Sequence, residues 1–254
     1  MAVSINIEKN FRDFSLKVKF EGSSAAIGLL GASGSGKSMT LRCIAGIETP
    51  DKGKIIINGK TVFDSEAGIN LKPQKRRIGY LFQNYALFPT MTVEQNISCG
   101  HRGGKASIRE KVADLIRRYH LEGLEKRYPS QLSGGMRQRA ALIRTLLPEP
   151  ELLLLDEPFS ALDYQTRLTV SDDIGQILRH SGKTALLVTH DLSEAISLSD
   201  RIIVLSRRPA TVSTIIPVTF SLEHDTPLNR RNAPEFKTYF NQLWKELNQN
   251  ETLA

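Results

Sequence analysis

One glycine-rich segment constrains the fold of this chain more than any other feature. An apolar run, Ala25–Leu30, stops at Gly31, and the segment Gly31-Ala-Ser-Gly-Ser-Gly-Lys-Ser38 follows it. The next residues, Met39–Ala45, are predicted to continue as a helix. A buried strand, a loop that matches the pattern G-x-x-x-x-G-K-[ST] and a helix together predict a phosphate-binding loop. This order of elements favours an α/β protein with a parallel sheet.

The residue types in this loop suit the chemistry of a polyphosphate. Successive backbone N–H groups can surround phosphate oxygens only where side chains do not intervene, and the start of the helix adds its partial positive charge. Lys37 is expected to reach the β- and γ-phosphates, and the Ser38 hydroxyl is expected to ligate Mg²⁺. The loop residues predicted to bind nucleotide are Gly31, Ala32, Ser33, Gly34, Ser35, Gly36, Lys37, Ser38 and Met39.

Two further strands are predicted to end in side chains suited to catalysis. The run Glu151–Glu157 contains four consecutive leucines and predicts a strand that delivers two acids to its carboxyl end, where sites of α/β proteins lie. Asp156 is expected to hold Mg²⁺ through water, and Glu157 to act as the general base that orients the attacking water. A third strand, Thr184–Thr189, ends at His190, which can approach the γ-phosphate from the same edge.

A further motif gives the chain a family resemblance. The segment Leu132-Ser-Gly-Gly-Met-Arg-Gln-Arg139 resembles the signature motif of ATP-binding cassette (ABC) ATPases. Other motifs follow in the order of that family: Gln83 resembles the Q-loop, Ser160–Asp163 the D-loop and His190 the switch histidine. Over roughly residues 1–208, the resemblance implies a P-loop NTPase core with a mainly parallel sheet, an N-terminal antiparallel β subdomain and an inserted α-helical subdomain near residues 88–148.

The resemblance also implies how the site works. In ABC ATPases two cassettes stack head to tail, so the signature of one copy closes over the ATP held by the other. A hydroxyl and bare N–H groups at a helix start form a second anion site. The residues expected at that second copy's nucleotide are Ser133, Gly134, Gly135 and Asp163. The implied catalytic residues are Glu157, His190 and Gln83. The implied Mg²⁺ ligands are Ser38, Gln83 and Asp156.

Two groups of aromatic and other apolar side chains each allow two interpretations. An aromatic side chain near the N-terminus is expected to stack on adenine, and Phe11 is preferred over Phe14, which begins an alternating strand on its apolar face. A second cluster lies behind the Q-loop and consists of Tyr85, Leu87, Phe88 and Met91. These side chains either pack in the core or line the groove that, by resemblance, receives the coupling helix of a membrane permease.

Composition and charge limit where the chain acts. Its 254 residues include two cysteines and no apolar run long enough to span a membrane. The charged N-terminus lacks an apolar signal core, and we expect a peripheral protein on the cytoplasmic face of the membrane. Residues 1–150 hold 24 Lys and Arg against 13 Asp and Glu, a net charge of +11, with dense pieces at residues 72–77 and 102–118. We assign this excess to ATP and to anionic lipid, not to nucleic acid.

The particular function is predicted from two regions. Residues 69–89 resemble molybdate and sulfate importer ATPases, whereas residues 205–210 and the Pro-Glu-Phe segment at 234–236 resemble the nitrate, sulfonate and taurine group. The chain is therefore expected to energise import of a small oxyanion, with a permease and, indirectly, a solute-binding protein as partners. The alternative is the ATPase of an exporter. An ATPase of nucleic-acid maintenance is less favoured, because about 94 residues between Lys37 and Leu132 leave no room for a long coiled coil.

Residues 209–254 are predicted to form a C-terminal extension. Pro209–Val218 is expected to be a strand or an extended arm, and Asn232–Glu235 to open a helix as a capping box. Apolar side chains then recur at helical spacing, at Phe236, Tyr239, Phe240, Leu243, Trp244 and Leu247. This amphipathic helix is expected to dock either on its own cassette or on a partner subunit.

Overall fold

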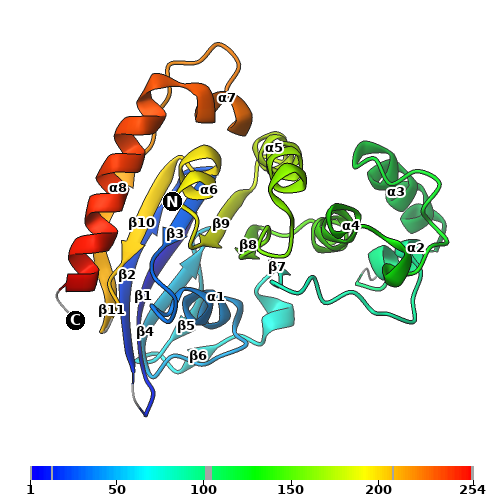
Figure 1. Ribbon diagram of the computed structural model, residues 1–254. Coiled ribbons are helices and arrows are strands. Elements are labelled where there is room, and N and C mark those ends of the chain that lie inside the picture. Colours follow the sequence, from blue (N-terminus) through cyan, green and yellow to red (C-terminus); the bar gives the residue numbers. More distant parts are fainter. Residues whose placement is uncertain (1, 13, 101–104, 208, 253–254) are drawn as a thin grey trace.

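The computed structural model describes residues 2–12, 14–100, 105–207 and 209–252. The strands within these ranges form one 11-stranded sheet (Figure 1). The strand order is β6-β5-β4-β1-β2-β11-β10-β3-β9-β8-β7. Strands of the antiparallel part are β1 (Val3–Asn10), β2 (Ser15–Gly22), β4 (Lys52–Ile57), β5 (Lys60–Asp64) and β6 (Ile69–Asn70). Strands of the parallel part are β3 (Ala26–Leu30), β7 (Ile78–Leu81), β8 (Leu152–Asp156), β9 (Thr184–Thr189) and β10 (Arg201–Leu205).

The register of the parallel strands brings the predicted functional segments together. In β3 and β8 every residue is buried, as expected for strands covered on both faces. Leu30 pairs with Thr189, and Asp156 pairs with Val188. The residues that follow these strands, Gly31, Glu157 and His190, therefore emerge side by side at the carboxyl edge of the sheet.

Helices cover both faces of the parallel strands. Leu152 and Leu154 pack in a cluster with α1 (Lys37–Ala45), whereas Leu153 and Leu155 pack in a different cluster with α5 (Tyr164–His180). The third flanking helix is α6 (Leu192–Leu198). This alternation along β8 explains why its first four residues, Leu152–Leu155, are all apolar.

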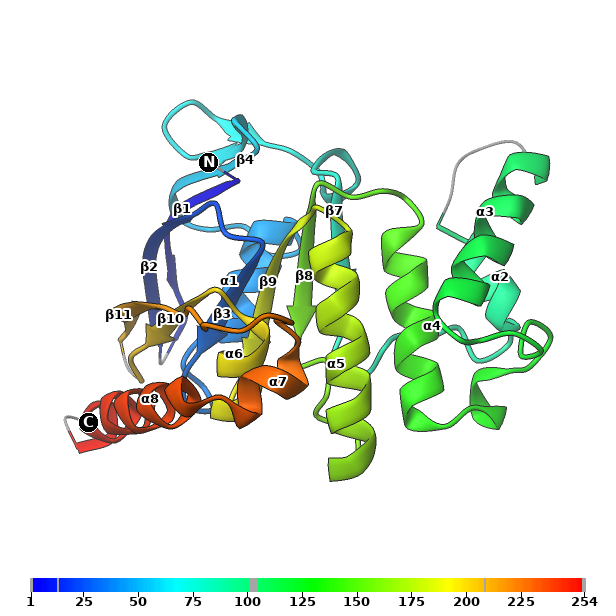
Figure 2. The same ribbon diagram turned by 90° about the horizontal axis from the view of Figure 1, so that it is seen from above.

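The inserted helical subdomain lies beyond β7. Figures 1 and 2 show α2 (Val93–Ser98), α3 (Lys105–Arg118) and α4 (Gly134–Leu146) grouped at the opposite end of the molecule from the C-terminal helix. Val112, Ile116 and Tyr119 are buried. Short 3₁₀ turns occupy Pro73–Lys75 and Pro129–Gln131. The predicted fold class is confirmed. No helix in the described part of the chain is long and apolar enough to cross a membrane.

One cation of the basic segment at residues 72–77 lies inside the protein. Arg76 is 2% exposed, and its guanidinium donates to the carbonyl oxygens of Cys43 and Ile44 at 2.9 and 2.8 Å. These carbonyls belong to the last turn of α1, where acceptors lack helical partners. Gly46, with φ of 78°, ends the helix, and a Cβ there would lie 2.5 Å from Arg76 Nε. The Arg76 side chain therefore caps the C-terminal end of α1.

The C-terminal segment differs from its prediction in one respect. Residues 227–232 form a short helix, α7 (Pro227–Asn232), and a separate helix, α8 (Pro234–Thr252), begins after it. The predicted capping box at Asn232 is wrong, because Asn232 closes α7 and its amide donates to Leu228 O. Glu235 instead accepts from the backbone N–H of Ser221.

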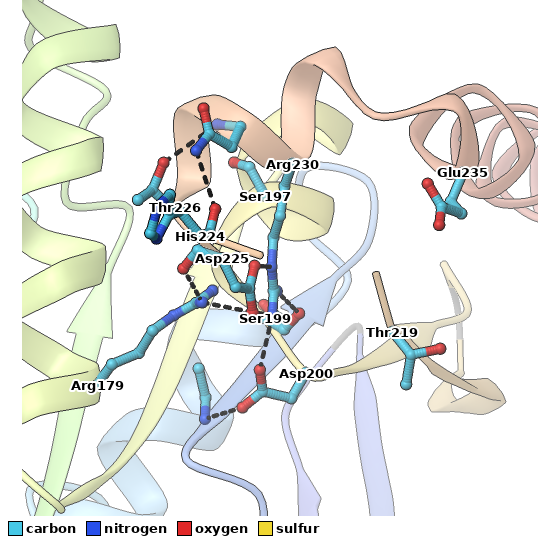
Figure 3. Close-up of polar contacts among 12 residues, drawn as sticks. Arg179, Ser197, Ser199, Asp200, Thr219, His224, Asp225, Thr226, Arg230 and Glu235 are labelled. Carbon is cyan, nitrogen blue, oxygen red and sulfur yellow. Dashed lines mark hydrogen bonds and ion pairs between the residues drawn. The ribbon is translucent and has the colours of Figure 1, made fainter. Parts of the chain in front are cut away.

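Strand β11 (Ala210–Pro217) and α8 are both part of the cassette's packing. β11 runs antiparallel to β10 and parallel to β2, so it joins the two parts of the sheet. On α8, Leu243 is fully buried in a cluster with residues of β10 and α6, which answers the question left open by the helical pattern. A cluster of charged groups around Arg230 fixes α7 beside these elements (Figure 3). Arg208, the last residue of the predicted cassette, lies outside the described residues.

Candidate active site

The glycine loop adopts a conformation that only glycines allow at several positions. Gly34 and Gly36 have φ angles of 79° and 83°, in the left-handed region that other residues rarely adopt. A Cβ at Gly31 would lie 2.6 Å from Ser35 Oγ, and one at Gly36 would lie 2.9 Å from the ring of Phe14. Side chains are therefore excluded from the loop both by backbone conformation and by space.

Lys37 and Ser35 occupy the interior of the loop. Lys37 is 5% exposed, and its Nζ donates to Gly31 O at 2.8 Å and to Ala32 O at 2.9 Å. Burial lowers the pKa of Lys37, while Glu157 and Asp156 act in the opposite direction. Ser35 is fully buried below the loop.

Asp156 joins the loop to the neighbouring strand. The Ser38 hydroxyl donates to Asp156 Oδ1 at 2.7 Å, and the Tyr80 hydroxyl donates to Oδ2 at 2.8 Å. Burial and the adjacent carboxylate raise the pKa of Tyr80, so this phenol stays a hydrogen-bond donor. The sequence predicted that Ser38 and Asp156 act together but missed Tyr80. No sequence motif marks Tyr80, because its contact with Asp156 depends on the pairing of β7 with β8.

The three residues predicted to be catalytic meet at Glu157. Gln83 Nε2 donates to Glu157 Oε2 at 3.1 Å, and His190 Nδ1 lies 3.3 Å from Glu157 Oε1. Glu157 has a left-handed backbone with φ of 44°, which is uncommon for a residue with a side chain. Its N–H donates to Val188 O, two residues before His190. The structure thus brings together one side chain from each of three separate segments.

Two cavities lie along this edge. One, of about 390 Å³, is bounded by the loop, Gln83 and Glu157. Its lining residues are Phe14, Ser33, Gly34, Gly36, Lys37, Ser38, Met39, Gln83 and Glu157. The other, of about 530 Å³, lies on the side of Asp156. Its lining residues are Ser38, Arg42, Phe82, Gln83, Asn84, Asp156, Ser160 and Ala161.

The aromatic residues near the N-terminus form a stacked pair. Phe14 lines the cavity beside the loop, and Phe11 stacks on Phe14 with ring centroids 5.8 Å apart. Phe11 is 36% exposed, and Lys9 lies over its outer ring face at 5.8 Å. The selection of Phe11 for adenine therefore stays a prediction, with Phe14 the aromatic ring nearer to the loop.

Among the predicted signature and D-loop residues, Ser160 and Ala161 line the cavity beside Asp156, whereas Ser133, Gly134, Gly135 and Asp163 line neither cavity. Ser133 caps α4 and accepts a hydrogen bond from Met136 N at 3.3 Å, and Gly134 lies against Leu162. Gly135 packs so closely on α5 that a Cβ would lie 3.0 Å from Val170. Asp163 caps α5 by accepting from Thr166 N, and this bond lowers the pKa of Asp163. Within this chain, therefore, Ser133, Gly134, Gly135 and Asp163 do not line the cavities beside the glycine loop.

The aromatic cluster behind the Q-loop divides into buried and exposed members. Tyr85 is 6% exposed and belongs to the hydrophobic core of the helical subdomain. Phe88 is 47% exposed, and Leu87 and Met91 are half-buried. Of the two interpretations left open by the sequence, core packing holds for Tyr85, whereas Phe88 is available to a partner.

Comparisons with known sequences agree with this arrangement. The ABC transporter family matches residues 12–160. An ABC transporter ATP-binding protein of Bacillus subtilis, YtlC, is 43% identical over 87% of this chain and 83% of its own length. The aliphatic sulfonates import ATP-binding protein SsuB of Bacillus licheniformis is 41% identical over 89% of this chain and 83% of that protein. The sulfate/thiosulfate import ATP-binding protein CysA 1 of Agrobacterium fabrum is 46% identical over 77% of this chain, which spans 56% of that relative.

Solved structures resemble most of this fold. A dimer of the ATP-binding cassette MJ0796 in a post-hydrolysis state with ADP and Pi matches with a TM-score of 0.71 at 27% identity, covering 86% of this chain and 99% of the other. The cassette cbiO1 of Clostridium perfringens matches with a TM-score of 0.73 at 26% identity, covering 84% and 87%. The fold and the edge site define a P-loop ATPase. Within that class, the chain belongs to the ABC transporter family and binds ATP.

Proposed function

We propose that this chain is the ATP-hydrolysing subunit of an importer for a small oxyanion. The observation that carries the hydrolytic part is the convergence of Gln83 and His190 on Glu157, beside the glycine loop. The oxyanion is supported by the names of the relatives, which import sulfate, thiosulfate or aliphatic sulfonates. The substrate itself would contact a permease and a solute-binding protein, and no residue of this chain.

In this proposal Glu157 is the general base. Its carboxylate accepts from Gln83 and lies beside His190, so it is held in place to accept a proton from a water that attacks the γ-phosphate. Lys37 exchanges its two carbonyl partners for phosphate oxygens, which is favourable because a charged acceptor replaces neutral ones. His190 is positioned to contact the γ-phosphate from the same edge.

The residues beside the loop fit Mg²⁺. The Ser38 hydroxyl, the Asp156 carboxylate and the Gln83 amide offer oxygen ligands of the kind that Mg²⁺ prefers, and Ser38 already contacts Asp156. The described residues contain no cluster of three or more His, Cys, Asp or Glu side chains that could hold a metal alone. A site with one carboxylate suits an ion that arrives with the nucleotide. When bound, Mg²⁺ would neutralise charge developing on the phosphates.

The proposed assembly is a head-to-tail dimer at the cytoplasmic face of a membrane. Ser133, Gly134, Gly135 and Asp163 do not line the loop cavities of their own chain, which supports their predicted place at the nucleotide of a second copy. The solved MJ0796 cassettes are dimers. Phe88, exposed on the helical subdomain, is the side chain best placed to contact a permease.

Two substitutions test the hydrolytic function. Glu157→Gln keeps the hydrogen-bonding shape but removes the base, so we expect ATP-bound dimers to accumulate and turnover to fall by about 10²-fold or more. Lys37→Ala should instead weaken ATP binding itself. Size-exclusion chromatography with ATP and a phosphate-release assay distinguish the two effects. Near-normal turnover by Glu157→Gln would contradict the assigned role.

The transported ion needs a separate test. Proteins encoded beside this chain's gene should include a permease and a solute-binding protein. Binding of that solute-binding protein to sulfate, molybdate, nitrate and sulfonates, measured by calorimetry, would identify the anion. A neighbouring permease without a solute-binding protein would favour export instead.

A further inference from the structure

The Q-loop contains two consecutive residues in an unfavourable conformation. Tyr85 and Ala86 have φ angles of 61° and 46°, both in the left-handed region, although neither is glycine. L-residues adopt this region rarely, and surrounding contacts must hold them there. The turn begins two residues after Gln83, which bonds Glu157. Its shape therefore bears directly on where the Gln83 side chain lies.

One arginine holds both residues of this turn. Arg144 Nη2 donates to Tyr85 O at 2.8 Å, and Nη1 donates to Ala86 O at 2.6 Å. Its guanidinium also lies over the Phe88 ring, 5.8 Å from the centroid. A planar guanidinium is suited to such paired bonds, because one N–H on each of its two terminal nitrogens points in the same direction. Arg144 belongs to α4, so this helix is fastened to the turn.

The Tyr85 side chain then reaches the backbone beside the proposed base. Its hydroxyl is buried and donates to Pro158 O at 3.3 Å. Pro158 directly follows Glu157, whose own φ is left-handed. Glu157 is thus contacted from two sides by one loop, at its carboxylate by Gln83 and at the adjoining carbonyl by Tyr85.

We infer that Arg144 and Tyr85 are positioning residues that hold Gln83 and Glu157 in register for hydrolysis. Arg144 fixes the strained turn, and Tyr85 ties that turn to the carbonyl of Pro158, the residue that follows the base. This inference rests on the proposed function, because it requires Glu157 to act as the base. Neither residue contacts nucleotide in this proposal.

The same contacts connect the base to the far end of α4. Ser133 caps the start of this helix, and Arg144 lies 11 residues further on, a distance of about 16 Å along the axis. If Ser133 binds the nucleotide of a second copy, the helix is held at both ends. Formation of the dimer then fixes Arg144, and through Tyr85 it fixes the geometry of Glu157.

Conservative substitutions separate this role from simple packing. Tyr85→Phe removes only the hydroxyl, and Arg144→Lys keeps the charge but cannot hold both carbonyls. Two control variants change the same residue types nearby. Tyr119→Phe alters another buried tyrosine of the same core, whose hydroxyl has no hydrogen-bond partner among the described residues. Arg118→Lys alters another arginine of the helical subdomain, which pairs with Asp114 at 2.8 Å and lies outside the signature segment.

The assay is ATP hydrolysis by the full chain, with kcat and KM measured separately. We expect Tyr85→Phe to lower kcat about fivefold, as for loss of one neutral hydrogen bond, and Arg144→Lys to lower it at least as much, with KM within about twofold. Both controls should stay within about twofold of the wild-type kcat. Binding of a fluorescent ATP analogue should be unchanged in all four variants.

A double-mutant cycle decides whether the effect passes through Gln83. Tyr85→Phe should have little further effect on kcat in a Gln83→Ala background, because the geometry that it maintains is already lost. The inference would be overturned if the effects of the two substitutions on kcat multiplied fully. It would also be overturned if the Tyr85→Phe variant had a kcat no lower than that of Tyr119→Phe. Failure of the proposed function looks different: Glu157→Gln would then turn over normally.

Discussion

Replacing Arg230 by methionine tests how firmly the C-terminal segment is held to the cassette (Figure 3). The Arg230 side chain is 4% exposed and bonds Asp225 Oδ1 and Oδ2 at 2.5 and 2.7 Å. It also donates to Ser199 O at 2.7 Å and to Asp200 Oδ1 at 3.2 Å. Methionine keeps an unbranched apolar stem of similar shape but offers no donor, so the substitution removes this set of bonds while largely preserving volume.

The expected loss of stability depends on the interactions that Asp225 keeps after Arg230 is replaced. Removing one member of a buried ion pair typically costs about 3–5 kcal/mol. Asp225 is 38% exposed and also pairs with Arg179 at 2.6 Å, so its charge stays partly compensated. We therefore expect the free energy of unfolding to fall by about 2–4 kcal/mol. With an unfolding entropy of about 2.1 cal/mol/K per residue, a chain of this size should melt about 4–8 °C lower.

Differential scanning calorimetry measures this shift, with Arg118→Met as the matched control. Arg118 pairs with Asp114 at 2.8 Å but is 69% exposed, so its removal should cost less than about 1 kcal/mol. The pH dependence gives a second signature. Burial alone would raise the pKa of Asp225, but hydrogen bonds from Arg230 and Arg179 hold it below the ordinary value. The cluster's stabilisation is therefore lost as the pH falls through that lowered pKa, and the two proteins should converge in acid. Equal melting temperatures for both variants at neutral pH would refute the reasoning.

Two further predictions concern buried titratable groups. Burial raises the pKa of Cys43 to about 12, whereas Cys99 is exposed, so a maleimide at pH 7.5 should label Cys99 only, and mass spectrometry of a Cys99→Ser variant should show no label until the chain is denatured. Burial likewise raises the pKa of Glu194, so its ionised form costs stability that grows as pH rises above the ordinary carboxyl range. Glu194→Gln should therefore gain melting temperature relative to wild type as the pH rises above the ordinary carboxyl range, and the opposite trend would contradict the assignment.

The main chemistry of the site could be predicted because it depends on strand ends. A buried strand that ends at Leu30, Asp156 or Thr189 places its next residue at the carboxyl edge, and parallel pairing brings those edges together. The sequence could not predict the contact between Tyr80 and Asp156. That hydrogen bond depends on β7 pairing with β8, and about 70 residues of the inserted subdomain separate the two strands.

Local patterns failed where a distant contact decided the outcome. Asn232 to Glu235 matched a capping box, but the chain ends one helix there and starts another, because Arg230 fixes α7 against Asp225 and Ser199. Tyr85 stood in a segment that fitted either a groove or a core. Its burial follows from a hydroxyl bond to a carbonyl 73 residues away, which no local spacing reveals.

The positions of two arginines also change how the basic excess of the first 150 residues should be interpreted. Arg76 and Arg144 donate to backbone carbonyls at the end of α1 and in the Q-loop, and Arg76 also donates to Leu71 O and to the neutral side-chain amide of Asn70. Burial lowers the pKa of both groups, and no carboxylate is among these hydrogen-bond acceptors. Their charges therefore count in the sequence total but serve to satisfy backbone acceptors. The charge available to ATP or to anionic lipid is smaller than the net charge of +11 suggests.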